Sequence, residues 1–119
     1  MTTLVFEQPM PGLDPHTVYE LDAVDGADGV FSLCPSDDPD VRLFVLEAAL
    51  YAPAYSPAVE GESASIGLEP GDPARILVVA TPGQGGTSVN LAAPVLVNET
   101  DGRAVQAILD GWDLRAPLG

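Results

Sequence analysis

Cysteine is scarce in this sequence, and that scarcity limits both disulfide bonding and redox chemistry. The only cysteine, Cys34, excludes a disulfide within the chain. It ends an apolar run and precedes Pro35, which predicts a half-buried structural thiol, because reactive thiols need positively charged neighbours. A single free thiol also fits a reducing cytosol.

Positive charge is almost as scarce. The chain has four basic residues, all of them arginine, against eighteen acidic residues, which gives a formal net charge of -14. A surface this negative repels a phosphate backbone, so we expect no direct contact with nucleic acid or with an anionic membrane. It would attract a basic protein and speed the encounter. Solubility, or adaptation to a salty cytoplasm, explains the charge equally well.

Long apolar runs are absent. The longest, residues 43–55, contains Glu47 and Pro53 and is shorter than the roughly 20 residues that a membrane-spanning helix needs. The first residues have no basic start and no apolar region of signal-peptide length. We therefore expect a cytoplasmic protein.

The sequence shows no constellation for catalysis or for metal or phosphate binding. Its only histidine, His16, lies in a predicted turn, where we expect it to be exposed, and no Ser-His-Asp or Cys-His signature accompanies it. Three aspartates hint at calcium but lack the EF-hand pattern and its glutamate: Asp22, Asp25 and Asp28. We predict a protein that is not an enzyme and uses no cofactor or metal, while a divergent enzyme with acidic catalytic residues stays an alternative.

Glycine and proline, by contrast, are abundant, with twelve of each in 119 residues. Such frequent turn residues favour short strands over long helices. The length and the hydrophobic fraction of 46% fit one folded domain over residues 1–119. The pattern predicts strands at residues 4–7, 16–24, 29–34, 41–46, 75–81, 88–97 and 104–109.

The strand pattern predicts the fold class. Alternation in the second strand directs Tyr19, Leu21 and Ala23 toward a core, and the nearly continuous apolar run 41–46 is typical of a strand buried on both faces. No strand–helix–strand alternation is present, which disfavours a parallel sheet. We predict an all-β fold, a small irregular antiparallel meander barrel of about seven or eight short strands, since closure removes exposed edges.

Two segments are less regular. Residues 47–55 could form one helical turn that Pro53 would end. Residues 56–73 are the least hydrophobic part of the chain, and we expect a surface excursion with a short helical turn near Ser65–Leu68. The last residues, 111–119, are expected to form a tail that contains Trp112.

The most informative segment is residues 87–109, where two β-rich runs flank Asp101-Gly102, the strongest short-range hairpin signal. Asparagine is unfavourable within strands, so Asn90 and Asn98 are expected to bond backbone groups at a bulge or turn, or to contact a partner. Pro94 predicts an edge or a bulge, because proline cannot donate to the ladder. An edge there would offer a site for strand addition by a partner.

Side chains in this hairpin resemble a family. Val89-Asn90-Leu91, Ala93-Pro94, Val97-Asn98 and Gly102 followed by Gln106-Ala107-Ile108-Leu109 are similar to the C-terminal signature of the FliW family of flagellar assembly factors. Further matches follow in the same order along nearly the whole chain: Pro11-Gly12-Leu13, the acidic turn 36–40 with the strand after it, Ile76–Pro82 and Arg115-Ala116-Pro117-Leu118.

The resemblance implies a protein that works by binding. Members of this family bind flagellin in the cytoplasm before export, and freed of flagellin they bind the RNA-binding carbon storage regulator and stop it repressing flagellin translation. It therefore implies flagellin and this basic regulator as partners, a chaperone-like role, and translational control without contact to RNA. We expect a monomer or a weak homodimer.

Two departures from the family pattern affect this expectation. Typical members begin with an additional strand or two before the Leu4 region, so one side of the barrel is expected to be open or covered by a partner. The segment between Tyr55 and Arg75 is shorter than in many relatives and lacks a convincing acidic helix.

The candidate partner-binding residues are few. The densest acidic patch consists of Asp37, Asp38 and Asp40. These side chains either contact a basic partner or bond nearby backbone N–H groups, as aspartates do in turns beside a proline. Trp112 is either a core residue or an exposed anchor, since tryptophan is favoured at interface hot spots. Asn90, Pro94 and Asn98 complete the set. A different class of function, a small apolar ligand held inside the barrel, would require an interior cavity.

Overall fold

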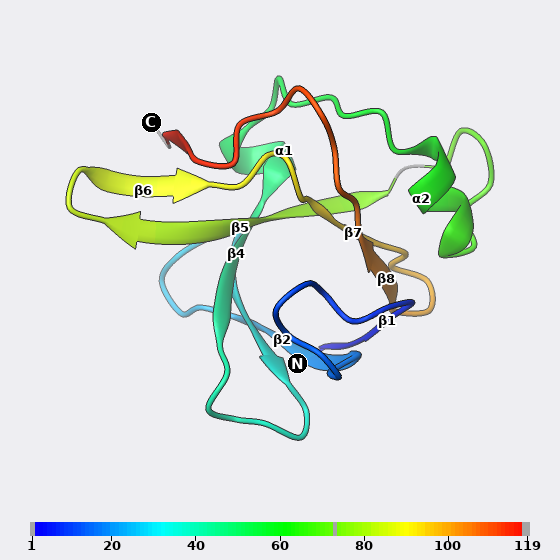
Figure 1. The fold of residues 1–119 in the computed structure, drawn as a ribbon, viewed down its shortest axis with the longest axis horizontal. Coiled ribbons are helices and arrows are strands. Elements are labelled where there is room, and N and C mark those ends of the chain that lie inside the picture. The colour runs from blue at the N-terminus through cyan, green and yellow to red at the C-terminus, as the bar shows by residue number, and fades with distance from the viewer. Residues whose placement is uncertain (1, 73, 118–119) are drawn as a thin grey trace.

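The computed structural model describes residues 2–72 and 74–117 (Figure 1). Over this part of the chain it has nine strands and two short helices. The strands are β1 (Thr2–Phe6), β2 (Val18–Ala23), β3 (Val30–Pro35), β4 (Leu43–Glu47), β5 (Arg75–Gly83), β6 (Gly86–Val89), β7 (Val95–Val97), β8 (Arg103–Gln106) and β9 (Ala116–Pro117). The helices are α1 (Ala48–Tyr51) and α2 (Glu60–Ser65).

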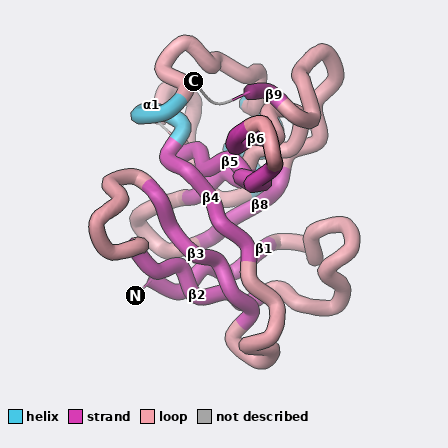
Figure 2. The backbone as a smooth tube through the Cα atoms, turned by 90° about the vertical axis from the view of Figure 1, so that its left-hand side faces the viewer, coloured by secondary structure: helices cyan, strands magenta, loops and turns pink. Residues whose placement is uncertain are grey.

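Seven of these strands form a closed barrel in the order β4-β3-β2-β1-β8-β7-β5, and β5 pairs back with β4. All pairs are antiparallel except β1 with β8, where Val5 lies opposite Arg103. The β-barrel prediction is confirmed, with one parallel pair where only a meander was expected. The expected open side is wrong, because β1 pairs with both β2 and β8, and Figure 2 shows the strands wrapping around one interior.

The barrel interior is filled by side chains from alternate strand positions. Eleven buried residues form this cluster, each no more than 3% exposed: Leu4, Phe6, Met10, Tyr19, Leu21, Leu33, Val45, Leu77, Val95, Val97 and Ala104. Tyr19 and Leu21 thus face the core as predicted, whereas Ala23 is exposed at the end of β2. The filled interior removes the basis for the hypothesis of an apolar ligand inside the barrel.

A second apolar cluster lies outside the barrel. Leu46, Ala48, Val78 and Val89 are buried there, and Tyr55, Ile76, Leu91 and Ala116 pack against them. In β4, Val45 points into the barrel and Leu46 into this outer cluster, which confirms the prediction of a strand buried on both faces. The outer cluster therefore holds the C-terminal tail and the segment after α1 against the sheet.

The predicted strand 88–97 is wrong as a single element. The chain leaves β6 after Val89 and re-enters the sheet at Val95. Strand β6 forms an antiparallel hairpin with β5, and β7 pairs with β8. The Asn90 side chain accepts a hydrogen bond from the Ala92 amide at 3.0 Å, and Pro94 has no amide hydrogen to donate. Both features favour an interruption at this point.

The irregular segments differ from their predictions in detail. Helix α1 ends before Pro53, as expected. Helix α2 begins at Glu60 and ends at Ser65, earlier than the predicted turn at Ser65–Leu68. Gly67 has φ of +85°, and the amides of Gly67 and Leu68 donate to the carbonyls of Ala64 and Ser63, a Schellman motif that stops the helix. We call the segment 56–72, which contains α2, the strap.

The tail was not among the predicted strands, but its β9 pairs with β6, with Ala116 opposite Val89. None of the described helices is long and apolar enough to cross a membrane.

Candidate partner-binding surfaces

The acidic turn, residues 36–40, follows β3 and is joined to β4 by residues 41–42. The side chain of Asp37 is 81% exposed and that of Asp38 is 37% exposed. Asp38 performs the expected turn chemistry, because its carboxylate accepts a hydrogen bond from the Asp40 amide at 3.3 Å. Asp37 and Asp40 are exposed, so the turn presents carboxylates to solvent at one end of the barrel.

His16 holds this turn, which sequence reasoning missed. Its Nδ1 atom lies 3.1 Å from Oδ1 of Asp37 and its Nε2 atom lies 3.5 Å from Oδ2 of Asp38. The imidazole is only 15% exposed, so the expectation of an exposed histidine is wrong. His16 and Asp37 are 21 residues apart in sequence, and no local signal links them. The contact fixes the acidic turn against the loop before β2.

Tyr19 lies behind the acidic turn, opposite Pro35 in the β2–β3 register. Its side chain is fully buried, and its hydroxyl has no hydrogen-bond partner among the described residues. Burial raises the pKa of Tyr19, and the negative charge of Asp37 raises it further. Cys34, beside them on β3, is half-buried as predicted, with Sγ 3.7 Å from the carbonyl oxygen of Asp38.

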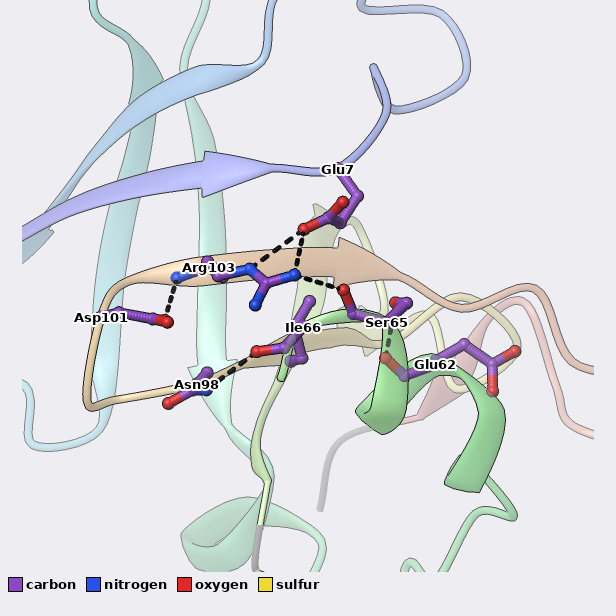
Figure 3. A network of polar contacts seen from close by, with 7 residues as sticks. All are labelled: Glu7, Glu62, Ser65, Ile66, Asn98, Asp101 and Arg103. Atoms are coloured by element: carbon purple, nitrogen blue, oxygen red, sulfur yellow. Dashed lines mark hydrogen bonds and ion pairs between the residues drawn. The ribbon is translucent and has the colours of Figure 1, made fainter. Parts of the chain in front are cut away.

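The hairpin turn 98–102 fastens the strap to the barrel (Figure 3). The buried side-chain amide of Asn98 donates to the carbonyl of Ile66 at 2.8 Å, and its side-chain oxygen accepts from the Thr100 amide at 3.0 Å. Asn98 thus has the backbone-bonding role that its position in a turn predicted. The partner carbonyl lies in a distant segment, which no sequence pattern indicated.

Arg103 makes the second attachment, and it was not among the predicted residues. Its Nη2 atom donates to the Ser65 carbonyl at 2.7 Å and to Oε1 of Glu7 at 3.0 Å (Figure 3). One guanidinium therefore joins the end of β1, the start of β8 and the end of α2. The only sequence signal for this role is that Arg103 is one of four basic residues in an acidic chain.

Glycine is required where the strap meets Arg103. A Cβ atom on Gly67 would lie 2.6 Å from Nη1 of Arg103, and the φ of +85° disfavours any other residue. Gly102 is more tightly constrained at the hairpin turn, because its Cβ would lie 2.7 Å from a backbone atom, the carbonyl oxygen of Thr3, which cannot move aside as the end of the Arg103 side chain can. The signature glycine therefore allows β1 to approach the hairpin.

Pro94 and Asn90 lie in the interruption between β6 and β7. Pro94 is fully buried, and its carbonyl accepts a hydrogen bond from the Ala107 amide at 2.9 Å. Residues 92–94 therefore already bond to the chain that follows β8, and Pro94 itself presents no accessible edge. These two residues can influence a partner only by shaping the surface around them.

Trp112 lies on the outer side of the barrel and is 36% exposed. Its ring packs edge-on against Tyr55, with the ring centroids 4.7 Å apart. The Tyr55 hydroxyl donates to the carbonyl of Leu91, and burial raises the pKa of Tyr55 to about 12. Leu114, two residues further on, is 68% exposed. The tail therefore offers an aromatic and an aliphatic side chain on a fixed support.

The described residues contain two clefts outside the barrel near the strap. The larger, about 710 Å³, lies between α1, the start of β5 and the turn at 98–100, and the other, about 340 Å³, lies under α2. Within residues 2–72 and 74–117, no group of three or more His, Cys, Asp or Glu side chains is arranged to hold a metal ion.

Comparisons with known proteins agree on one family. The family described as FliW protein matches residues 1–118. The flagellar assembly factor FliW 2 of Desulfotalea psychrophila is 32% identical over 120 aligned residues, which cover 97% of this chain and 79% of that protein. A crystal structure of the flagellar assembly factor FliW superposes with a TM-score of 0.86 at 19% identity, covering 97% of this chain and 84% of the other. The last comparison supports the fold.

Proposed function

This chain belongs to the FliW family of flagellar assembly factors, and we propose that it binds flagellin in the cytoplasm and antagonises the RNA-binding carbon storage regulator, so that it controls flagellin translation. In this proposal the protein acts by binding alone. Bound flagellin excludes the regulator, and export of flagellin frees the protein to bind the regulator. No step requires a catalytic group, a cofactor or contact with RNA.

The acidic turn is the observation that carries the part of the proposal that concerns the regulator. A protein that grips RNA must present basic surface, and this chain offers exposed carboxylates on a turn that His16 holds in place. A net charge of -14 adds a long-range field that attracts such a partner and repels RNA once the complex has formed. Asp37, Asp38 and Asp40 are the proposed contact residues.

The tail is the proposed contact for flagellin. Trp112 and Leu114 are exposed apolar side chains, and the contact of Trp112 with Tyr55 limits the entropy that a partner must remove on binding. Asn90, Pro94 and Asn98 contribute indirectly, by fixing the chain next to Leu91 and the strap. A contact of this kind depends little on salt, unlike one made by the acidic turn.

Titration calorimetry against flagellin and against the carbon storage regulator, each at low and at high salt, tests the proposal. We expect binding to both, with affinity for the regulator falling steeply as salt rises and affinity for flagellin changing little. A ternary titration should show that saturating flagellin prevents binding of the regulator. Failure to bind either protein, or undiminished repression of flagellin translation at saturating amounts of this protein, would overturn it.

A further inference from the structure

The two clefts near the strap are joined along the outer side of β5. Both are lined by Leu68, Asp72, Ala74 and Ile76. Together they form one groove, bounded by α1 on one side and by α2 on the other. The residues of the acidic turn and Trp112 line neither cleft, although Tyr55, which packs against Trp112, lines the larger one.

The smaller cleft is lined mainly by apolar and small side chains, whereas the larger cleft also has polar and charged ones, among them Arg75, Asn98 and Thr100. Alternation along β5 directs Leu77 into the barrel and leaves Ile76 on the outer side, where it lines both clefts. Ala49 and Ala52 line the α1 side, and Pro57 and Val59 line the other. A concave site that combines apolar surface with placed polar groups is the usual form of a binding site, and here the shared apolar element is the outer face of β5 at Ile76.

The rim of the groove is acidic. Five acidic residues line at least one of the two clefts: Glu47, Glu60, Glu69, Asp72 and Glu99. Arg75 is the single basic residue among the lining residues, and it already forms two ion pairs. Its Nη2 atom lies 2.9 Å from Oε1 of Glu47, and its Nε atom lies 3.6 Å from Oε1 of Glu99. An occupant with positive charge beside an apolar side chain therefore matches both the floor and the rim.

The attachment of the strap allows the groove to widen. Helix α2 has no buried residue, and the strap contributes one fully buried side chain, Ile66. The hydrogen bonds from Asn98 and Arg103 attach the strap to the barrel at Ser65 and Ile66. Neither of these bonds involves the rim residues Glu60 and Glu69. Segments with few buried apolar contacts open at low free-energy cost.

We propose that this groove is a second docking surface, which takes a short peptide segment of a partner protein with an apolar anchor flanked by Lys or Arg. The anchor enters beside Ile76 and the basic side chains reach the glutamates of the rim. The choice of a peptide as occupant rests on the proposed function as a protein-binding factor. The site itself does not depend on which protein supplies the segment.

Amide chemical shifts of the isotope-labelled protein, followed during titration with synthetic peptides, test this. One peptide combines Leu with Lys, a second combines Leu with Glu, and a third combines Ser with Lys. We expect saturable shifts at Ala49, Leu68 and Ala74 with the Leu–Lys peptide alone, because only this peptide supplies both the anchor and the charge. Equal binding of the Ser–Lys peptide, or shifts centred on the acidic turn, would overturn the proposal.

Four arginine variants localise the binding. Ala49→Arg and Ala64→Arg place a large basic side chain on an exposed position of each cleft, and we expect each to raise the peptide Kd about tenfold. Ala54→Arg and Ala58→Arg change the net charge equally at exposed positions that line neither cleft, and they should bind as the unaltered chain does. Equal affinities in all four variants would refute the groove.

The same variants separate this proposal from the function proposed above. If the unaltered protein binds flagellin or the carbon storage regulator and the two groove variants bind as well as their controls, the groove is not the docking surface for that protein. If the unaltered protein binds neither protein, the proposed function fails, while the peptide titration still decides the groove.

Discussion

The side-chain amide of Asn98 donates a hydrogen bond of 2.8 Å to the carbonyl of Ile66, across 32 residues of sequence. Both residues are buried, and this bond together with that of Arg103 joins the hairpin to the strap. The Asn98 side chain therefore satisfies one distant carbonyl and one local amide, that of Thr100, at once.

Asn98→Ala should destabilise the fold. The change leaves the buried Ile66 carbonyl and the Thr100 amide without their partner, at a cost of about 1–3 kcal/mol. Urea unfolding measures the difference in free energy. Thr100→Ala, at an exposed position in the same turn, is the control and should change the free energy of unfolding by less than about 0.5 kcal/mol. Equal effects would contradict the role assigned to Asn98.

Two glycines with similar positive φ angles allow strain and crowding to be separated. Gly12 and Gly102 have φ of +84° and +79°, but a Cβ on Gly12 meets nothing within 4 Å, whereas one on Gly102 lies 2.7 Å from the Thr3 carbonyl oxygen. Gly12→Ala should cost about 1 kcal/mol from backbone strain alone. Gly102→Ala should cost clearly more and loosen the β1–β8 pairing, which thermal unfolding and amide exchange of Val5 report.

Stability should fall at high pH through Tyr55. Burial raises the pKa of Tyr55 from 10.0 to about 12, so the folded state holds this proton where the unfolded chain loses it. The contribution is complete below pH 10 and is lost as the pH rises toward about 12. The free energy of unfolding, measured across this window, should decline less steeply in Tyr55→Phe. An identical decline in both proteins would show that other groups govern it.

Neutralising the acidic turn should weaken binding of the carbon storage regulator. The double change Asp37→Asn and Asp38→Asn removes two exposed carboxylates, and exposed ion pairs contribute up to about 1 kcal/mol each. We expect a several-fold higher Kd at low salt, mainly through a slower association rate. Asp25→Asn with Asp110→Asn, at exposed positions outside the acidic turn, gives the same net charge. Equal loss in both would mean that overall charge, not the turn, drives binding.

The sequence predicted the barrel well because local alternation records which face of a strand is buried. Tyr19 and Leu21 occupy the buried positions that alternation assigns, and only Ala23, at the end of β2, does not. The pattern failed at residues 88–97, where Asn90 and Pro94 interrupt a mostly apolar run. Such a run alone does not distinguish one long strand from two short ones.

The candidate surfaces were only partly predictable, because their contacts join distant segments. The acidic turn and Trp112 were found from composition and residue type. The contact of His16 with Asp37 and the contact of Arg103 with Ser65 follow from tertiary structure and have no local sequence signal. Gly67 did carry a local sequence signal, because a glycine commonly follows the end of a helix. The predicted helical turn at Ser65–Leu68 included this glycine and therefore lay too close to the C-terminus of the segment.

Removing Arg103 should release the strap while the barrel stays folded. Arg103→Ala deletes the donor to the Ser65 carbonyl and the ion pair with Glu7, but the buried Ile66 and the bond from Asn98 remain. Amide exchange of residues 63–68 should therefore accelerate about tenfold or more, while amides of β2 and β3 exchange as before. Arg42→Ala removes an arginine that lies over the Phe44 ring, and it should leave the strap unchanged. Uniform acceleration in both variants would show that the strap opens only when the whole domain unfolds, and the groove could not then widen independently of the barrel.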